Sequence, residues 1–129
     1  MHIIVPGKPI PLKRHRMGGR KAYDSQSGVK TAFALYVKSK APLIVYEEPL
    51  EVSLVFGFEI PKSASKKRQQ QLLDSPRQAK PDIDNLIKFV LDALNAVVWK
   101  DDSIICNISA KKVYSSHPYT EIMVNPLEE

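Results

Sequence analysis

The hydrophobic pattern is most distinctive between residues 80 and 102, KPDIDNLIKFVLDALNAVVWKDD. Pro81 and Asp84 are typical of a helix start, because proline needs no amide partner there and aspartate can cap free amides. At about 100° per residue, a helix over 84–98 is apolar except for one narrow stripe. Because buried charge is costly unless it is paired, this stripe predicts a mainly buried helix whose polar side chains have a task. The stripe consists of Asp84, Asn85, Lys88, Asp92 and Asn95.

The remaining periodicity predicts further helices and strands. Strands are predicted over 1–5, 49–59, 103–114 and 119–125, and helices over 25–40 and 63–73. Residues 12–24 are basic and lack an apolar period, which indicates a mobile surface loop. The turn at 115–118 predicts a C-terminal β-hairpin. This order indicates a single α+β domain over 1–129, in which a small mixed β-sheet packs against the largely buried central helix.

Composition sets the broad class of protein. The chain has 129 residues, of which 43% are hydrophobic, enough for one core. No apolar run approaches the roughly 18 residues of a membrane span, and residues 1–9 lack the pattern of a signal peptide. The single cysteine, Cys106, excludes an internal disulfide framework and is expected to be a buried thiol. We therefore expect a cytoplasmic protein without a membrane partner.

The basic residues are concentrated rather than spread. The net charge of +5 is a weak indication alone, but 12 of the 19 Lys and Arg residues fall in two stretches, 8–21 and 62–80. The alternative for such stretches is a solvated charged surface, and for 12–24 the two interpretations weigh evenly. A nucleic-acid backbone is a fitting partner for these cations. The candidate contacts are Lys13, Arg14, Arg16, Arg20 and Lys21, then Lys66, Lys67, Arg68 and Lys80.

Four carboxylates flank the central helix. Asp82 and Asp84 lie where it begins, whereas Asp101 and Asp102 follow it, and a straight helix separates its ends by roughly 20 Å. A joint site therefore requires the chain to fold back, or the helix to end early near Asn95. Converging carboxylates would hold Mg²⁺ or Mn²⁺, which polarises phosphate and activates water. The alternative is ordinary capping, ion pairing and a polar turn, and the pattern alone leaves the two about equal.

The same stretch resembles a known signature. KPDIDNLIKFVLDALNAVVWKDDSII is similar to the motif of the RusA-like endodeoxyribonucleases, phage- and prophage-associated Holliday-junction resolvases. Upstream, PKSASKKRQQ resembles the lysine-rich helix of that family, and GKPIPLKRHR resembles its N-terminal loop. The chain departs at Ala96, where the family often has glycine, and at Ile104, where it often has glutamine.

The resemblance implies Mg²⁺-dependent cleavage of four-way DNA junctions by a homodimer, with paired symmetrical cuts, in DNA recombination and repair. Mn²⁺ is the expected substitute, and no organic cofactor is expected. The resemblance places metal ligands on Asp82, Asp84 and Asp102 and a catalytic lysine on Lys88, and it implies that Asp102 returns to the helix start. Asp101 is a weaker match, as a further ligand or as a support. Two alternatives stay open: a non-catalytic nucleic-acid-binding module with a structural Asp cluster, or a less selective nuclease on flaps or single strands.

Overall fold

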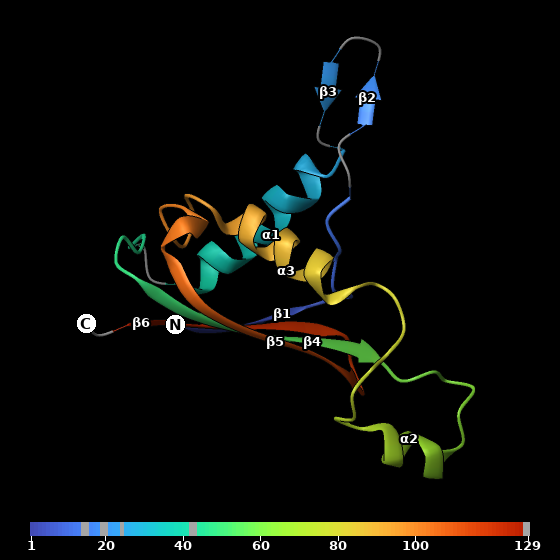
Figure 1. Ribbon diagram of the computed structural model, residues 1–129. Helices are drawn as coiled ribbons and strands as arrows, with labels where there is room; N and C mark the ends of the chain where they lie inside the picture. Colours follow the sequence, from blue (N-terminus) through green and yellow to red (C-terminus); the bar gives the residue numbers. More distant parts are fainter. Residues whose placement is uncertain (14–15, 19–20, 24, 42–43, 128–129) are drawn as a thin grey trace.

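A four-stranded mixed sheet forms the base of the molecule (Figure 1). The computed structural model describes residues 1–13, 16–18, 21–23, 25–41 and 44–127. The sheet has the order β1-β6-β4-β5, in which β4 runs parallel to β5 and antiparallel to β6. Its strands are β1 (His2–Pro6), β4 (Leu50–Glu59), β5 (Ile105–Ser115) and β6 (Tyr119–Pro126). The α+β class predicted from the sequence is confirmed.

Helices α1 (Ser27–Lys40) and α3 (Ile83–Leu94) cover one face of this sheet (Figure 1). Alternate residues of β4 point at them, and the core continues through an edge-to-face contact between Phe33 and Phe89, whose ring centroids are 5.5 Å apart. The short helix α2 (Lys66–Leu72) lies beyond the end of β4 and buries no residue. In the described ranges, no helix is long and apolar enough to cross a membrane.

Helix α3 ends four residues earlier than the pattern predicts. Its buried residues lie on one side, as the apolar spacing requires, and are Leu86, Phe89, Val90, Ala93 and Leu94. After Leu94 the backbone turns away, and Ala96 has a positive φ of 64°. Asn95 accepts a 2.8 Å hydrogen bond from the indole of Trp99, which is fully buried. The early end near Asn95, one of two alternatives left open by the sequence, is therefore the one observed.

Two predictions of local structure are wrong. The N-terminal basic segment contains a small antiparallel pair, β2 (Arg16–Gly18) and β3 (Lys21–Tyr23), where a loop was expected. These strands have no apolar alternation, so hydrophobicity gives no signal for them. The C-terminal hairpin is absent from the described part of the chain, because β5 and β6 both pair with β4, which lies between them. The nearly continuous burial of β4 is that of a central strand with two neighbours.

Cys106 also differs from its expected state. The side chain is exposed on β5, where a buried thiol was predicted. Strand β5 is the edge of the sheet, so a residue in an apolar run can still point to solvent. Among the described residues, no strand pairs with the outer side of β5 between Ile105 and Lys111.

Candidate active site

The start of α3 carries the first two candidate carboxylates. Asp82 occupies the N-cap position in an extended conformation, and its backbone carbonyl accepts the first helical hydrogen bond, from the Leu86 amide at 3.3 Å. Asp84 follows in the first turn, where negative charge suits the helix dipole. Both side chains are more than half exposed. The extended-then-helical backbone thus presents two carboxylates to solvent at one helix end.

Cations contact these carboxylates directly. Lys80 Nζ lies 2.6 Å from an oxygen of Asp82, and Lys88 Nζ lies 3.9 Å from an oxygen of Asp84, one turn along the helix. The hydrogen bond from Lys80, and then its charge, hold the pKa of Asp82 below its ordinary value, with a smaller contribution from Lys112. Asp82 is therefore ionised at neutral pH and available to a cation.

The segment before α3 is held by two further cationic side chains. Lys112 on β5 donates hydrogen bonds to the carbonyls of Ala79 and Pro81 at 2.6 and 2.8 Å. Arg77 donates to the carbonyls of Ala79 and Lys80 at 3.1 and 2.7 Å, and its guanidinium stacks on the ring of Phe58. The Lys80–Pro81 peptide bond is cis. Every carbonyl from residue 79 to 81 thus accepts a charge-assisted hydrogen bond.

An open hollow of about 530 Å³ lies against this segment, and we call it the α3 hollow. It combines two carboxylates with three cations, a setting for a phosphate bound next to a metal ion. Its lining residues are Pro76, Arg77, Asp82, Ile83, Asp84, Lys111 and Lys112. The lysines on β5 were missed from the sequence, because two lysines inside a strand pattern give no sign of which loop they will face.

The N-terminal segment also reaches the start of α3. The Leu12 amide donates a 2.9 Å hydrogen bond to the carbonyl of Asn85, and the Lys13 amide donates to the side chain of the buried Gln26 at 2.8 Å. This fixes the exposed Lys13 close to α3. Of the other predicted DNA contacts in this segment, Arg16 lies on β2 and Lys21 on β3. Arg14 and Arg20 lie outside the described residues.

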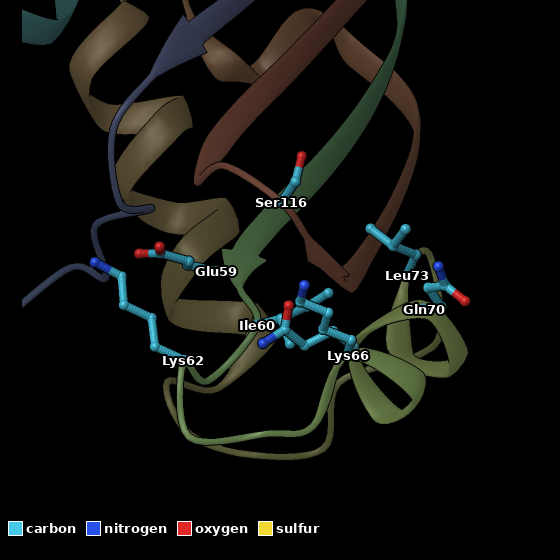
Figure 2. Close-up of a pocket in the computed structure, with 8 residues that line it drawn as sticks. Glu59, Ile60, Lys62, Lys66, Gln70, Leu73 and Ser116 are labelled. Carbon is cyan, nitrogen blue, oxygen red and sulfur yellow. The ribbon is translucent and has the colours of Figure 1, made fainter.

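The second basic stretch surrounds α2. Lys66, Lys67 and Arg68 are all exposed on this helix, and Ser65 caps it by accepting the amide of Arg68 at 3.1 Å. A second hollow, of about 410 Å³, separates α2 from the end of β4, with Lys62 and Lys66 at its margin and Ile60 and Leu73 supplying apolar surface (Figure 2). The stretch therefore presents a basic surface at the same end of the sheet as the α3 hollow.

Asp101 and Asp102 follow the C-terminal end of α3, the end opposite Asp82 and Asp84. They precede β5 in a short 3₁₀ turn, η1 (Asp102–Ile104), where Asp101 accepts the amide of Ser103 at 3.0 Å. Hydrogen bonding from the Ser103 side chain, and then from its backbone amide, holds the pKa of Asp101 below its ordinary value. From Ile105 to Lys112, β5 covers about 23 Å at 3.3 Å per residue. The predicted return of Asp102 to Asp82 is not found within one chain.

Consistent with this separation, no group of three or more His, Cys, Asp or Glu side chains in the described ranges is arranged to hold a metal ion. Within one chain the structure brings together Asp82, Asp84 and Lys88, together with Lys80. It leaves Asp102 and Asp101 apart from them. Any site that uses both ends of α3 needs a contribution from outside the single chain.

Comparison with known proteins identifies a matching family and a relative. A family model described as endodeoxyribonuclease RusA matches residues 6–125. The uncharacterized protein YqaN of Bacillus subtilis (strain 168) is 33% identical over 100 residues, which cover 74% of this chain and 70% of that protein. The family match includes both basic stretches, the start of α3 and the Asp101–Asp102 pair.

Proposed function

The chain belongs to the endodeoxyribonuclease RusA family, and on this basis we propose that residues 1–129 form one nuclease domain that resolves four-way DNA junctions with Mg²⁺. The observation that carries the proposal is the pair of exposed carboxylates, Asp82 and Asp84, within a hollow that also contains Arg77, Lys111 and Lys112. Carboxylates alone would repel DNA, whereas this combination suits a scissile phosphate together with a divalent cation.

The residues at the start of α3 fit a magnesium ion. Mg²⁺ prefers oxygen ligands, keeps several waters and is commonly held by one or two carboxylates together with substrate phosphate. Asp82 and Asp84 supply those carboxylates, and Mn²⁺ would substitute. When bound, such a cation supplies Lewis-acid activation of the phosphate and of the attacking water. Lys88, whose side chain is 61% exposed one turn away, would be positioned to neutralise charge on the phosphate.

The basic surfaces would hold the arms of the DNA. Lys13 lies on one side of α3, and Lys66, Lys67 and Arg68 project from α2. Lys80 lies in the segment that joins α2 to α3, and Arg16 and Lys21 belong to the β2–β3 pair. Backbone contacts of this kind carry shape rather than sequence information, which suits a nuclease that selects a branched structure.

A homodimer would complete the site. Within the described part of the chain, no strand pairs with the outer side of β5 from Ile105 to Lys111, and such an edge is a template for a second copy. Antiparallel pairing of residues 105–109 with their counterparts, centred on Asn107, would set residue 102 of one chain opposite residue 112 of the other. Asp102 of the second copy would then lie beside Lys112, at the α3 hollow. Two such sites would cut two equivalent strands symmetrically.

The first experiment uses purified protein and a synthetic four-way junction with labelled strands. We expect paired cuts near the crossover that require Mg²⁺ or Mn²⁺ and are lost in Asp82→Asn. Linear duplex, flap and single-strand competitors separate junction resolution from the less selective nuclease activity. Cleavage in EDTA, or full activity of Asp82→Asn, would contradict the proposal. Junction binding without any cleavage would favour the non-catalytic module.

A second experiment tests the shared site. Asp84→Asn and Asp102→Asn chains are each expected to be inactive, and they are co-refolded in equal amounts. In a mixed dimer with shared sites, one site receives Asp84 from one chain and Asp102 from the other, so roughly a quarter of wild-type nicking should return. If each site lies within one chain, every combination is defective. Absence of any recovered nicking in verified mixed dimers would therefore exclude the shared site.

A further inference from the structure

We infer that Lys112 is a positioning residue, which fixes the backbone before α3 so that Asp82 and Asp84 present their carboxylates as metal ligands. This inference rests on the proposed function for its catalytic consequence, but not for its structural one. Lys112 comes from the sheet and contacts a segment 31 and 33 residues away in sequence. Nothing in the resemblance to the nuclease signature assigns it a role.

The geometry is that of a clamp. The Lys112 ammonium donates to the Ala79 and Pro81 carbonyls at 2.6 and 2.8 Å, and the second of these immediately precedes Asp82. Hydrogen bonds from a charged donor are roughly twice as strong as neutral ones. The aliphatic part of the Lys112 side chain projects from the helix-covered face of the sheet, because Lys112 lies next to the buried Phe56 of β4 in the strand register. The rigid sheet thus sets the position of the residue before the first ligand.

Other contacts anchor this segment less completely. The Arg77 amide donates to the Lys112 carbonyl at 3.1 Å, which ties residue 77 to β5. The Arg77 side chain then bonds carbonyls only two and three residues ahead, so it folds the segment upon itself. Among the described residues, Lys112 alone provides side-chain hydrogen bonds from the sheet to residues 79–81.

An alternative role for Lys112 is purely electrostatic, and it predicts the opposite effect on metal binding when Lys112 is replaced. A cation close to Asp82 repels an incoming metal ion, so removing only its charge should tighten metal binding. Removing a clamp should weaken metal binding, because the carboxylates lose their preset geometry. Lys80 provides the matched comparison, since it is 83% exposed and contacts Asp82 at 2.6 Å without bonding the backbone.

The test compares Lys112→Met, Lys112→Arg and Lys80→Met by two readouts. The first is the Mn²⁺ concentration that gives half-maximal junction cleavage. We expect Lys112→Met to raise it about 10- to 100-fold, the usual effect of losing a residue that orients metal ligands. Lys112→Arg should restore most of the wild-type Mn²⁺ requirement. Lys80→Met removes a proposed DNA contact and should slow cleavage overall, but it should not raise the Mn²⁺ concentration that gives half-maximal cleavage.

The second readout is backbone hydrogen exchange of residues 79–86, which needs neither DNA nor metal. We expect faster exchange in Lys112→Met, and wild-type exchange in Lys80→Met. The inference is overturned if a folded Lys112→Met protein exchanges these amides at the wild-type rate. It is also overturned if this variant needs less Mn²⁺ than the wild type for half-maximal cleavage. If the wild-type protein does not cleave junctions, the proposed function fails, whereas hydrogen exchange still decides whether Lys112 is a clamp.

Discussion

The two ends of α3 each carry a pair of aspartates, yet their surroundings are opposite. At the start, Asp82 and Asp84 are exposed, contact lysines and border the α3 hollow. At the other end, the helix stops against the fully buried Trp99, and Asp101 uses its carboxylate to cap a turn. The first end has its backbone held by side chains from elsewhere, whereas the second end is stabilised by its own neighbours.

This difference teaches how one short helix can separate function from stability. The start of α3 carries charges that gain little from folding, so we expect substitutions there to affect chemistry. The end of α3 joins the core, so we expect substitutions there to affect unfolding. Four changes, taken from the largest expected effect to the smallest, test this division.

The largest effect is expected from Asp84→Asn. Loss of a carboxylate ligand should reduce junction cleavage on the order of 10²- to 10³-fold, because the cation contributes several kcal/mol to the transition state. The free energy of unfolding should change by less than about 0.5 kcal/mol, as for most surface substitutions. Cleavage assays and urea denaturation measure the two quantities.

The matched control is Asp92→Asn on the same helix. Asp92 pairs with Lys30, a lysine of α1 that is only 10% exposed, at 2.5 Å. We expect this change to lower the free energy of unfolding while cleavage by the folded protein persists. If Asp84→Asn and Asp92→Asn lose cleavage equally, the start of α3 does not differ in function from the rest of the helix.

The next effect concerns the other end of the helix, in Asn95→Ala. The fully buried indole of Trp99 would lose the acceptor that lies 2.8 Å away. We expect a loss of about 1–3 kcal/mol in the free energy of unfolding, the usual penalty for a buried donor without a partner. The exposed Asn125→Ala on β6 should change it by less than about 0.5 kcal/mol. Cleavage per folded molecule should be unaffected.

A smaller effect of opposite sign is expected from Ala96→Gly. Ala96 has a φ of 64°, in the left-handed region where a side chain is strained and glycine is not. We expect the free energy of unfolding to rise by about 0.5–1 kcal/mol. Ala32→Gly, an exposed position inside α1, should lower it by about 1 kcal/mol. If Ala96→Gly instead lowers the free energy of unfolding, the backbone at Ala96 is not strained.

The smallest effect is a change in the titration of Asp82. Lys80 holds its pKa below the ordinary value of 3.8, and the ion pair therefore contributes fully above that pH. The contribution is lost as the pH falls through the lowered pKa. In Lys80→Met the pKa should return toward 3.8, which carboxyl NMR measures. An unchanged pKa would show that Lys80 does not control this carboxylate in solution.

The local elements were largely predictable from the sequence because they follow apolar spacing. The ten residues of β4 appear where the pattern places them, whereas the N-cap of α3 is Asp82 and not the predicted Asp84, so the helix begins at Ile83. The strand order was not predictable, because alternation does not identify a neighbour. The turn after Ser115 indicated a hairpin, yet β4 lies between the two strands.

The candidate site was predictable only in part. Asp82, Asp84 and Lys88 are close in sequence, so helix geometry alone brings them together. Lys112 is 31 residues from Pro81, and its partners are backbone carbonyls, which a sequence does not distinguish. The stripe on α3 was also interpreted too uniformly, since Asp92 forms an ion pair with α1 and has no part in the α3 hollow.

Trp99 has a practical consequence for all of these experiments. It is the single tryptophan of the chain and is fully buried, so tryptophan fluorescence reports on the environment of this one residue. Its emission should be blue-shifted in the native protein and should shift to the red on unfolding. Because the proposed shared site uses Asp102, three residues from Trp99, the folded molecules are counted in the absence of Mg²⁺. Fluorescence thus counts folded molecules independently of the chemistry.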